Sequence, residues 1–255
     1  MASSKPTIII IPGSFSPASQ YSAVTTDLES HGYDVHAIDL ETVGRRDTPP
    51  SMYDDAAKLA ALITKLADEG KDVVLVPHSY GGVVACEASK GLAKSVREQE
   101  GKRGGVARIV FVTAVGPPVG QSIKDVFPPG ALDSFAITDG YMTADPALIA
   151  AVGFSHLPTE EALAHGSKLL NHVAASFEQP ITYAPYKDIP ISFLICEDEK
   201  LIVPELQKKM IAAMESDMPE GKTVDRHPVQ ADHGIHLSQP KAMAAVVRRS
   251  LGDTA

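Results

Sequence analysis

The chain has 255 residues, of which 44% are hydrophobic and 22% charged, so it suits one large domain or one domain with an insertion. A formal net charge of −9 argues against nucleic acid and against an anionic membrane surface as partners. The first residues form no apolar signal segment, and no apolar run is long enough to span a bilayer. We therefore expect a soluble protein of the cytoplasm.

Strands and helices alternate along the first 119 residues, which is typical of a parallel sheet with helices on both faces. The pattern predicts strands at 7–11, 35–40, 73–76 and 109–115. It predicts helices at 18–31, 54–67 and 83–97. This order of elements indicates the α/β class.

The alternation stops between about Gly120 and Tyr186 and then returns. In this middle part we expect short helices at 146–152 and 159–174. Beyond it we expect strands at 191–196 and 223–227, and helices around 210–214 and at 240–251. Residues 1–119 and 187–255 are thus predicted to form the core, and 120–186 a small inserted helical cap. Such a cap would cover the carboxyl edge of the sheet, where open α/β sheets bind ligands.

A candidate nucleophile lies in the segment His-Ser-Tyr-Gly-Gly at 78–82, between a predicted strand and a predicted helix. A serine held there by small residues is the pattern of a nucleophile elbow, whose strained turn lifts the hydroxyl away from the sheet. The two glycines let the helix approach closely, although Pro77 stands where the usual pattern has glycine. Ser79 is the predicted nucleophile, and His78 is expected to position the turn.

A serine nucleophile needs a base, and the base needs a group that orients it. In this architecture the order along the chain is serine, acid, histidine. His233 lies just before the last helix and is the predicted base, whereas His236 either lines the pocket or lies on the surface. The acid should follow the strand at 191–196, where three carboxylates stand in a row and only one can face the histidine: Glu197, Asp198 and Glu199.

The whole layout resembles the α/β-hydrolase superfamily, and more closely its branch of plant methylesterases and hydroxynitrile lyases. The resemblance covers nearly the full chain and rests on segments 11–15, 78–82, 195–202 and 232–240 together with Gln207. The branch usually has Cys-x-x-Asp-Lys-x-Ile-Pro after this strand, and alignment without gaps implies Glu199 as the acid. Asp198, one place earlier, is the alternative. Pro12 replaces the histidine that is usual after the first strand.

The resemblance also implies an oxyanion hole made of the backbone N–H groups of Ser14 and Tyr80. Phe15, Tyr80 and Phe154, with residues of the cap, are candidates to line the pocket. No metal ion and no organic cofactor is implied, since the late histidines have no organised carboxylate or cysteine partner.

These residues favour a serine hydrolase that acts on a small, largely apolar ester, lactone or related carbonyl compound through an acyl-enzyme. Three other functions fit the same layout: a lyase or carbon–carbon bond-cleaving enzyme, a cyclising enzyme of secondary metabolism, and a small-molecule receptor without activity. A lyase would benefit from a lysine near the pocket, and Lys200 is the one beside the motif. The sequence leaves open whether the protein acts as a monomer or a homodimer.

Overall fold

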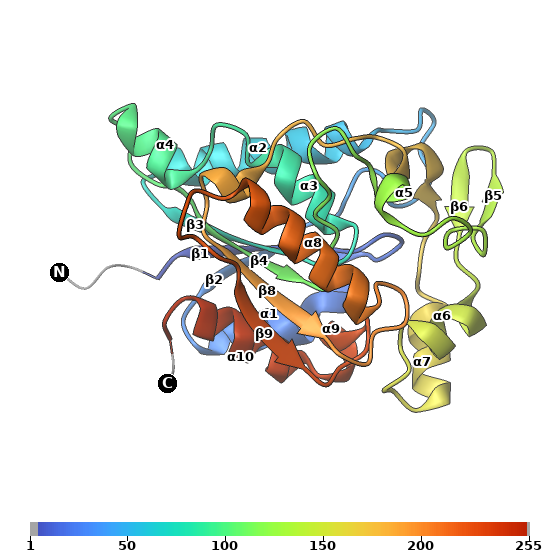
Figure 1. Ribbon diagram of the computed structural model, residues 1–255. Helices are drawn as coiled ribbons and strands as arrows, with labels where there is room; N and C mark the ends of the chain where they lie inside the picture. The colour runs from blue at the N-terminus through green and yellow to red at the C-terminus, as the bar shows by residue number, and fades with distance from the viewer. Residues whose placement is uncertain (1–4, 254–255) are drawn as a thin grey trace.

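Six parallel strands form the central sheet of the computed structural model, which describes residues 5–253 (Figure 1). Their order is β2-β1-β3-β4-β8-β9. The strands are β1 (Thr7–Ile11), β2 (Asp34–Ala37), β3 (Asp72–Pro77), β4 (Gly105–Val112), β8 (Ile191–Cys196) and β9 (Asp225–Val229). The inner strands are apolar runs buried on both faces, as expected for a parallel sheet covered by helices. Pro228 lies in β9, at an edge where its missing N–H is tolerated.

Helices pack on both faces of this sheet (Figure 1). One face is covered by α1 (Ser22–Ser30) and α10 (Pro240–Ser250), whose apolar side chains form a core with alternate residues of the strands. The other face is covered by α2 (Met52–Asp68), α3 (Gly81–Ala88) and α8 (Pro204–Asp217). The predicted doubly covered parallel sheet is therefore confirmed. None of the helices within residues 5–253 has the length and apolar character needed to cross a membrane.

Two predicted helices are divided in the structure. The helix expected at 83–97 is α3 followed by α4 (Lys94–Gln99), and the one expected at 18–31 begins as a 3-10 turn, η1 (Ala18–Tyr21). Gly91 lies between α3 and α4 with a φ of 72°, a left-handed conformation that ends a helix. Hydrophobic spacing continues across this break, so it does not reveal the interruption.

We call residues 120–186 the inserted segment; most of it lies beyond the carboxyl ends of the strands, and its last residues return to the start of β8 (Figure 1). This segment contains α5 (Ile123–Val126), α6 (Pro146–Val152), α7 (Thr159–Gly166) and η2 (Ala174–Phe177), and η3 (Pro185–Lys187) lies across its end. It also contains a small antiparallel sheet that we did not predict, made of β5 (Ala136–Thr138), β6 (Tyr141–Thr143) and β7 (His172–Val173). Asp139 and Gly140 join β5 to β6 with positive φ, as a tight hairpin requires. The helix expected at 159–174 ends at Gly166.

Candidate active site

Ser79 lies in a strained turn between β3 and α3. Its φ is 52°, a left-handed value that is costly for a residue with a side chain. A Cβ on Gly81 would overlap the carbonyl oxygen of Ile11, and one on Gly82 would overlap that of Val115. Only glycine fits at these two positions, because neighbouring backbone rather than a mobile side chain fills the space. The turn therefore has the geometry predicted for an elbow and presents Ser79 at the ends of β1 and β3.

The backbone amides of Ser14 and Tyr80, close to Ser79, have no acceptor within residues 5–253. Ser14 follows β1 and Tyr80 directly follows Ser79, so both lie where β1 and β3 meet in the sheet. Backbone N–H groups in proteins are nearly always paired, so two unpaired amides at one cavity are available to a ligand oxygen. This is the arrangement that the resemblance implies for an oxyanion site.

His233 and Glu199 form a buried pair. The Nδ1 of His233 lies 2.6 Å from Oε2 of Glu199, whose side chain is inaccessible to solvent. Glu199 also accepts a hydrogen bond from Oγ1 of Thr113 at 2.7 Å and one from the backbone N–H of Leu201 at 2.7 Å. Burial opposes ionisation of Glu199, but attraction to His233 and these hydrogen bonds outweigh it and lower its pKa to about 2. Glu199 is therefore a carboxylate at neutral pH.

The other two carboxylates of the run point elsewhere. Asp198 is half exposed and lies 3.3 Å from Nε2 of His156, a residue of the inserted segment. Glu197 is exposed and accepts a hydrogen bond from Gln230. Of the three candidates for the acid, only Glu199 contacts His233.

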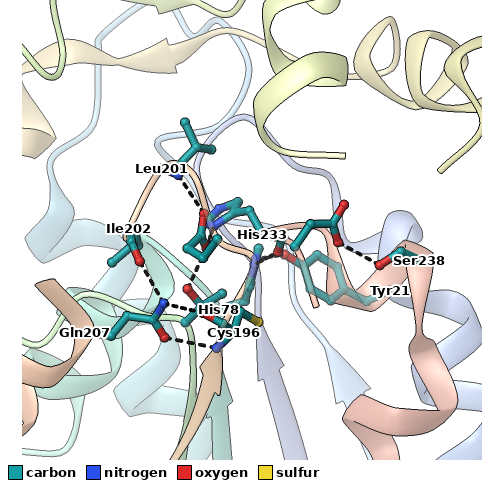
Figure 2. A network of polar contacts seen from close by, with 11 residues as sticks. Tyr21, His78, Cys196, Leu201, Ile202, Gln207, His233 and Ser238 are labelled. Carbon is teal, nitrogen blue, oxygen red and sulfur yellow. Dashed lines mark hydrogen bonds and ion pairs between the residues drawn. The ribbon is translucent and has the colours of Figure 1, made fainter. Parts of the chain in front are cut away.

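Gln207, on α8, holds the loop that carries Glu199 (Figure 2). Its side-chain amide donates to the carbonyls of Cys196 and Ile202 at 3.0 and 2.7 Å and accepts from the N–H of Cys196 at 3.2 Å. Gln207 is completely buried, so these three contacts are shielded from water. Such contacts fix the start and the end of the loop and so limit where the Glu199 carboxylate can lie.

A chain of hydrogen bonds connects the loop after β1 with the backbone of His233, as Figure 2 shows for Tyr21, His78 and His233. The hydroxyl of Tyr21 accepts from the N–H of Gly13 at 3.0 Å and lies 2.7 Å from Nδ1 of His78. The carbonyl of His233 can only accept, so Nε2–H of His78 donates to it at 2.9 Å. Burial lowers the pKa of His78 to about 3, so the ring is neutral and its Nδ1 accepts the proton of the Tyr21 hydroxyl. His78 is thus fixed as a neutral tautomer with a structural role in positioning.

Asp232 and Thr113 are two further positioning residues that the sequence analysis missed. Asp232 is fully buried, accepts from the N–H of His156 in the inserted segment and from Oγ of Ser238, both at 2.8 Å, and so fixes the loop of His233. Thr113 follows β4 with a φ of 36° and donates to Glu199. In the sequence, Thr113 is a polar residue at the end of an apolar strand, and Asp232 directly precedes the predicted base. These positions could have indicated both residues from the sequence.

A cavity of about 90 Å³ is bordered by Ser79, by His233 and by Ser14 and Tyr80, which carry the unpaired amides. On this measure one water occupies roughly 10–15 Å³, so the cavity suits a small organic group. Phe15 and Phe154 line this cavity, and the rings of Phe15 and Phe135 stack with centroids 5.2 Å apart. Most other wall residues are apolar and come from the inserted segment: Ile123, Phe127, Ala131, Leu132, Phe135, Ile149, Leu169 and Phe177.

Lys200 does not border this cavity. Its Nζ is exposed and lies 3.5 Å from the carbonyl oxygen of Ala151. Within residues 5–253, no group of three or more histidine, cysteine or acidic side chains is arranged to hold a metal ion.

The comparisons with known proteins identify the class. A model of the alpha/beta hydrolase family matches residues 8–246, so the chain belongs to the α/β-hydrolase family. "Probable hydrolase R7" of a Phoma species is 32% identical over 252 residues, which cover 97% of this chain and 99% of that protein. The predicted family is thereby confirmed, and the curated relative named a hydrolase indicates an enzyme of that kind.

Solved structures of the same fold extend the comparison. An extracellular α/β-hydrolase from a Paenibacillus species is described as sharing structural and functional homology with tobacco salicylic acid binding protein 2. Its structure has a TM-score of 0.77 and 21% sequence identity to this chain, and the match covers 96% of this chain and 99% of that one. A variant of polyneuridine aldehyde esterase has a TM-score of 0.73 and 17% identity, with 98% and 100% covered. At these identities the likeness shows the fold.

Three buried histidines predict how stability depends on pH. Burial lowers the pKa of His78 and of His172 to about 3, and burial with neighbouring histidines lowers that of His236 well below its ordinary value. Below about pH 6.5 the unfolded chain protonates these groups while the native protein does not, so acid favours unfolding. At pH values below the pKa of an unfolded-chain histidine, we expect each of the three histidines to lower the free energy of unfolding by about 1.4 kcal/mol for every pH unit of acidification.

Urea unfolding at pH 7, 6 and 5 measures this slope. The His172→Phe variant, whatever its stability at pH 7, should show a shallower decline than the wild type. A free energy of unfolding that stays constant between pH 6.5 and 5 would contradict the neutral state of the buried histidines.

Proposed function

We propose that the protein is a serine hydrolase that cleaves a small, largely apolar carboxylic ester or lactone through an acyl-enzyme. The observation that carries the proposal is the pair of His233 Nδ1 and Glu199 Oε2 at 2.6 Å, at the same cavity as a serine in an elbow conformation. A histidine held in one tautomer by a carboxylate is the base that a serine hydroxyl needs at neutral pH.

In this mechanism Ser79 attacks the carbonyl carbon and His233 accepts its proton at Nε2. Glu199 orients His233 and stabilises the imidazolium that forms. The N–H groups of Ser14 and Tyr80 donate to the oxyanion of the tetrahedral intermediate. His233 then protonates the leaving alcohol and later activates a water that hydrolyses the acyl-enzyme. Within residues 5–253 no hydrogen bond joins Ser79 to His233, and such bonds often form only when the substrate is bound.

The inserted segment 120–186 is proposed to act as the cap. It supplies most of the apolar wall and is joined to the loop of His233 by the hydrogen bond from Gly234 N–H to the Gly153 carbonyl, at 2.7 Å. An apolar wall with few polar groups suits an apolar acyl or alcohol group. The position of Lys200, exposed and outside the cavity, gives no support to the lyase alternative.

Hydrolysis of p-nitrophenyl acetate, butyrate and octanoate tests the proposal. We expect turnover of the short esters, with a pre-steady-state burst of p-nitrophenol if deacylation limits the rate. Cleavage of a cyanohydrin in the same preparation without turnover of any ester would instead favour the lyase. Absence of both activities, with saturable binding of an ester, would favour a receptor.

Tyr21 gives a positioning test of the same site. Tyr21→Phe leaves the Gly13 N–H and Nδ1 of His78 without their partner, which should loosen both the loop of Ser14 and the backbone of His233. We expect kcat for p-nitrophenyl butyrate to fall about tenfold with little change in KM, since a lost buried hydrogen bond costs about 1–3 kcal/mol. Tyr33→Phe is the matched control, because its hydroxyl bonds Asp253 outside the cavity. Unchanged kcat in Tyr21→Phe would contradict this positioning role.

A further inference from the structure

Four buried polar atoms without a hydrogen-bond partner in residues 5–253 gather where η1, α7 and the short helix α9 (Ile235–Ser238) meet. We call this place the polar junction; its atoms are Oε1 of Gln20, Nδ1 of His165, and Nδ1 and Nε2 of His236. Nε2 of Gln20 donates to the His165 carbonyl at 3.4 Å, and the His236 ring stacks on Tyr21, next to Gln20, at 4.2 Å. Buried polar groups are normally paired, so such a concentration points to a partner outside the chain.

The polar junction adjoins the cavity of Ser79 through His236, whereas Gln20 and His165 lie behind the cavity wall. His236 is 1% exposed, and it borders the same cavity as Ser79, His233 and Ser16. Its ring lies 4.9 Å from that of His78, which in turn lies 4.6 Å from that of His233. Phe154, another wall residue, lies 6.5 Å from the rings of both His165 and His236. A group bound at the junction would therefore belong to the molecule whose carbonyl faces Ser79.

The chemistry of the unpaired atoms restricts that group. Burial and the neighbouring histidines keep the pKa of His236 well below its ordinary value, so its ring is neutral and has one N–H donor and one acceptor nitrogen. Oε1 of Gln20 accepts only. A carboxylate could not donate to these acceptors, and an ammonium could not accept from the imidazole N–H. A hydroxyl does both.

We infer that the polar junction is a subsite for an uncharged hydroxyl group, and that the natural substrate is a hydroxylated ester or lactone whose remaining surface is apolar. This inference rests on the proposed function and adds the substrate class to it. The hydroxyl would bind His236 at the cavity wall, with Gln20 behind it as a second partner, while the apolar part lies against Phe154 and the aromatic wall. A substrate without the hydroxyl leaves these buried groups unpaired, which disfavours it.

Matched ester pairs test this inference. The pairs are p-nitrophenyl 2-hydroxybutyrate and 3-hydroxybutyrate against p-nitrophenyl butyrate, and ethylene glycol monobutyrate against propyl butyrate, so that the hydroxyl is placed on either side of the ester. We expect kcat/KM to be at least about tenfold higher for the hydroxylated member of one pair. In His236→Phe, which keeps a ring against Tyr21, that ratio should fall to about one.

Gln20→Leu is the second variant and should lower the ratio as well, which keeps the test valid if His236→Phe folds poorly. His36→Phe, a partly exposed histidine on β2, is the control and should keep the wild-type ratio. Ester turnover without preference for any hydroxylated member, or a preference that survives both substitutions, would overturn the inference and leave the proposed function standing. If no ester were hydrolysed, the proposed function would fail and this inference with it.

Discussion

Replacing Ser79 with alanine is expected to lower kcat for p-nitrophenyl butyrate by roughly 10⁴- to 10⁶-fold, the range seen when the nucleophile of such a site is removed. Ser79 is the serine at the cavity that lies in an elbow turn, whereas His78 is fixed by two hydrogen bonds and Ser14 is proposed to act through its backbone. Steady-state kinetics on purified protein measures the change.

The melting temperature should stay nearly constant in this variant. The Ser79 hydroxyl has no hydrogen-bond partner within residues 5–253, so alanine removes no contact that stabilises the fold. Ser95→Ala is the control, since Ser95 lies on α4 and outside the cavity. Full activity in Ser79→Ala would remove Ser79 from the mechanism.

Glu199→Gln is expected to lower kcat/KM by roughly 10³- to 10⁴-fold. The glutamine side chain keeps the shape of glutamate, but its neutral amide neither stabilises an imidazolium nor holds the tautomer that leaves Nε2 free to accept a proton. The Glu199 carboxylate accepts hydrogen bonds from His233, Thr113 and Leu201, so the substitution alters all three contacts.

Asp198→Asn is the matched comparison, one residue earlier in the same loop. Its carboxylate is half exposed and contacts His156, so we expect kcat/KM to change by less than about threefold, as for an exposed ion pair. Both variants are assayed with the same ester, and circular dichroism checks that each is folded. A large loss in Asp198→Asn with normal activity in Glu199→Gln would reverse the assignment of the acid.

Much of the fold could be predicted from the sequence because local patterns encode it. The buried strands are uninterrupted β-branched and aliphatic runs, and their alternation with helices indicates a parallel sheet. The elbow could be predicted for a physical reason too, since Gly81 and Gly82 face backbone carbonyls where no Cβ fits. The family model and the curated relative confirm the predicted family, whereas the role of the elbow stays a prediction.

The inserted segment was harder to predict. Its strands are two or three residues long, too short to show a period of two, and only the Asp139-Gly140 turn signalled a hairpin. The contacts of the candidate site were also beyond local pattern. Thr113, Asp232 and Tyr21 reach their partners across 86, 76 and 57 positions of the chain, so their roles depend on how the strands and the inserted segment pack.

The choice between Asp198 and Glu199 illustrates the same limit. From the residues alone, three consecutive carboxylates were equivalent, and the family resemblance gave a preference. In the fold the three side chains point in different directions, and the loop after β8 directs Glu199 inward towards Thr113 and His233. Gln207 holds that loop at both ends. Whether Glu199 is the acid in catalysis stays a prediction for the kinetic comparison above.

Labelling with a fluorophosphonate, followed by peptide mass spectrometry, shows whether Ser79 is an activated nucleophile. The reagent reacts with serines that a base activates, and the adduct resembles the tetrahedral intermediate held by the two amides. We predict one adduct, on Ser79, that forms at neutral pH and is lost in Glu199→Gln or after heat unfolding. Absence of an adduct on Ser79 in the folded protein, or an adduct on another residue, would show that Ser79 is not the activated nucleophile.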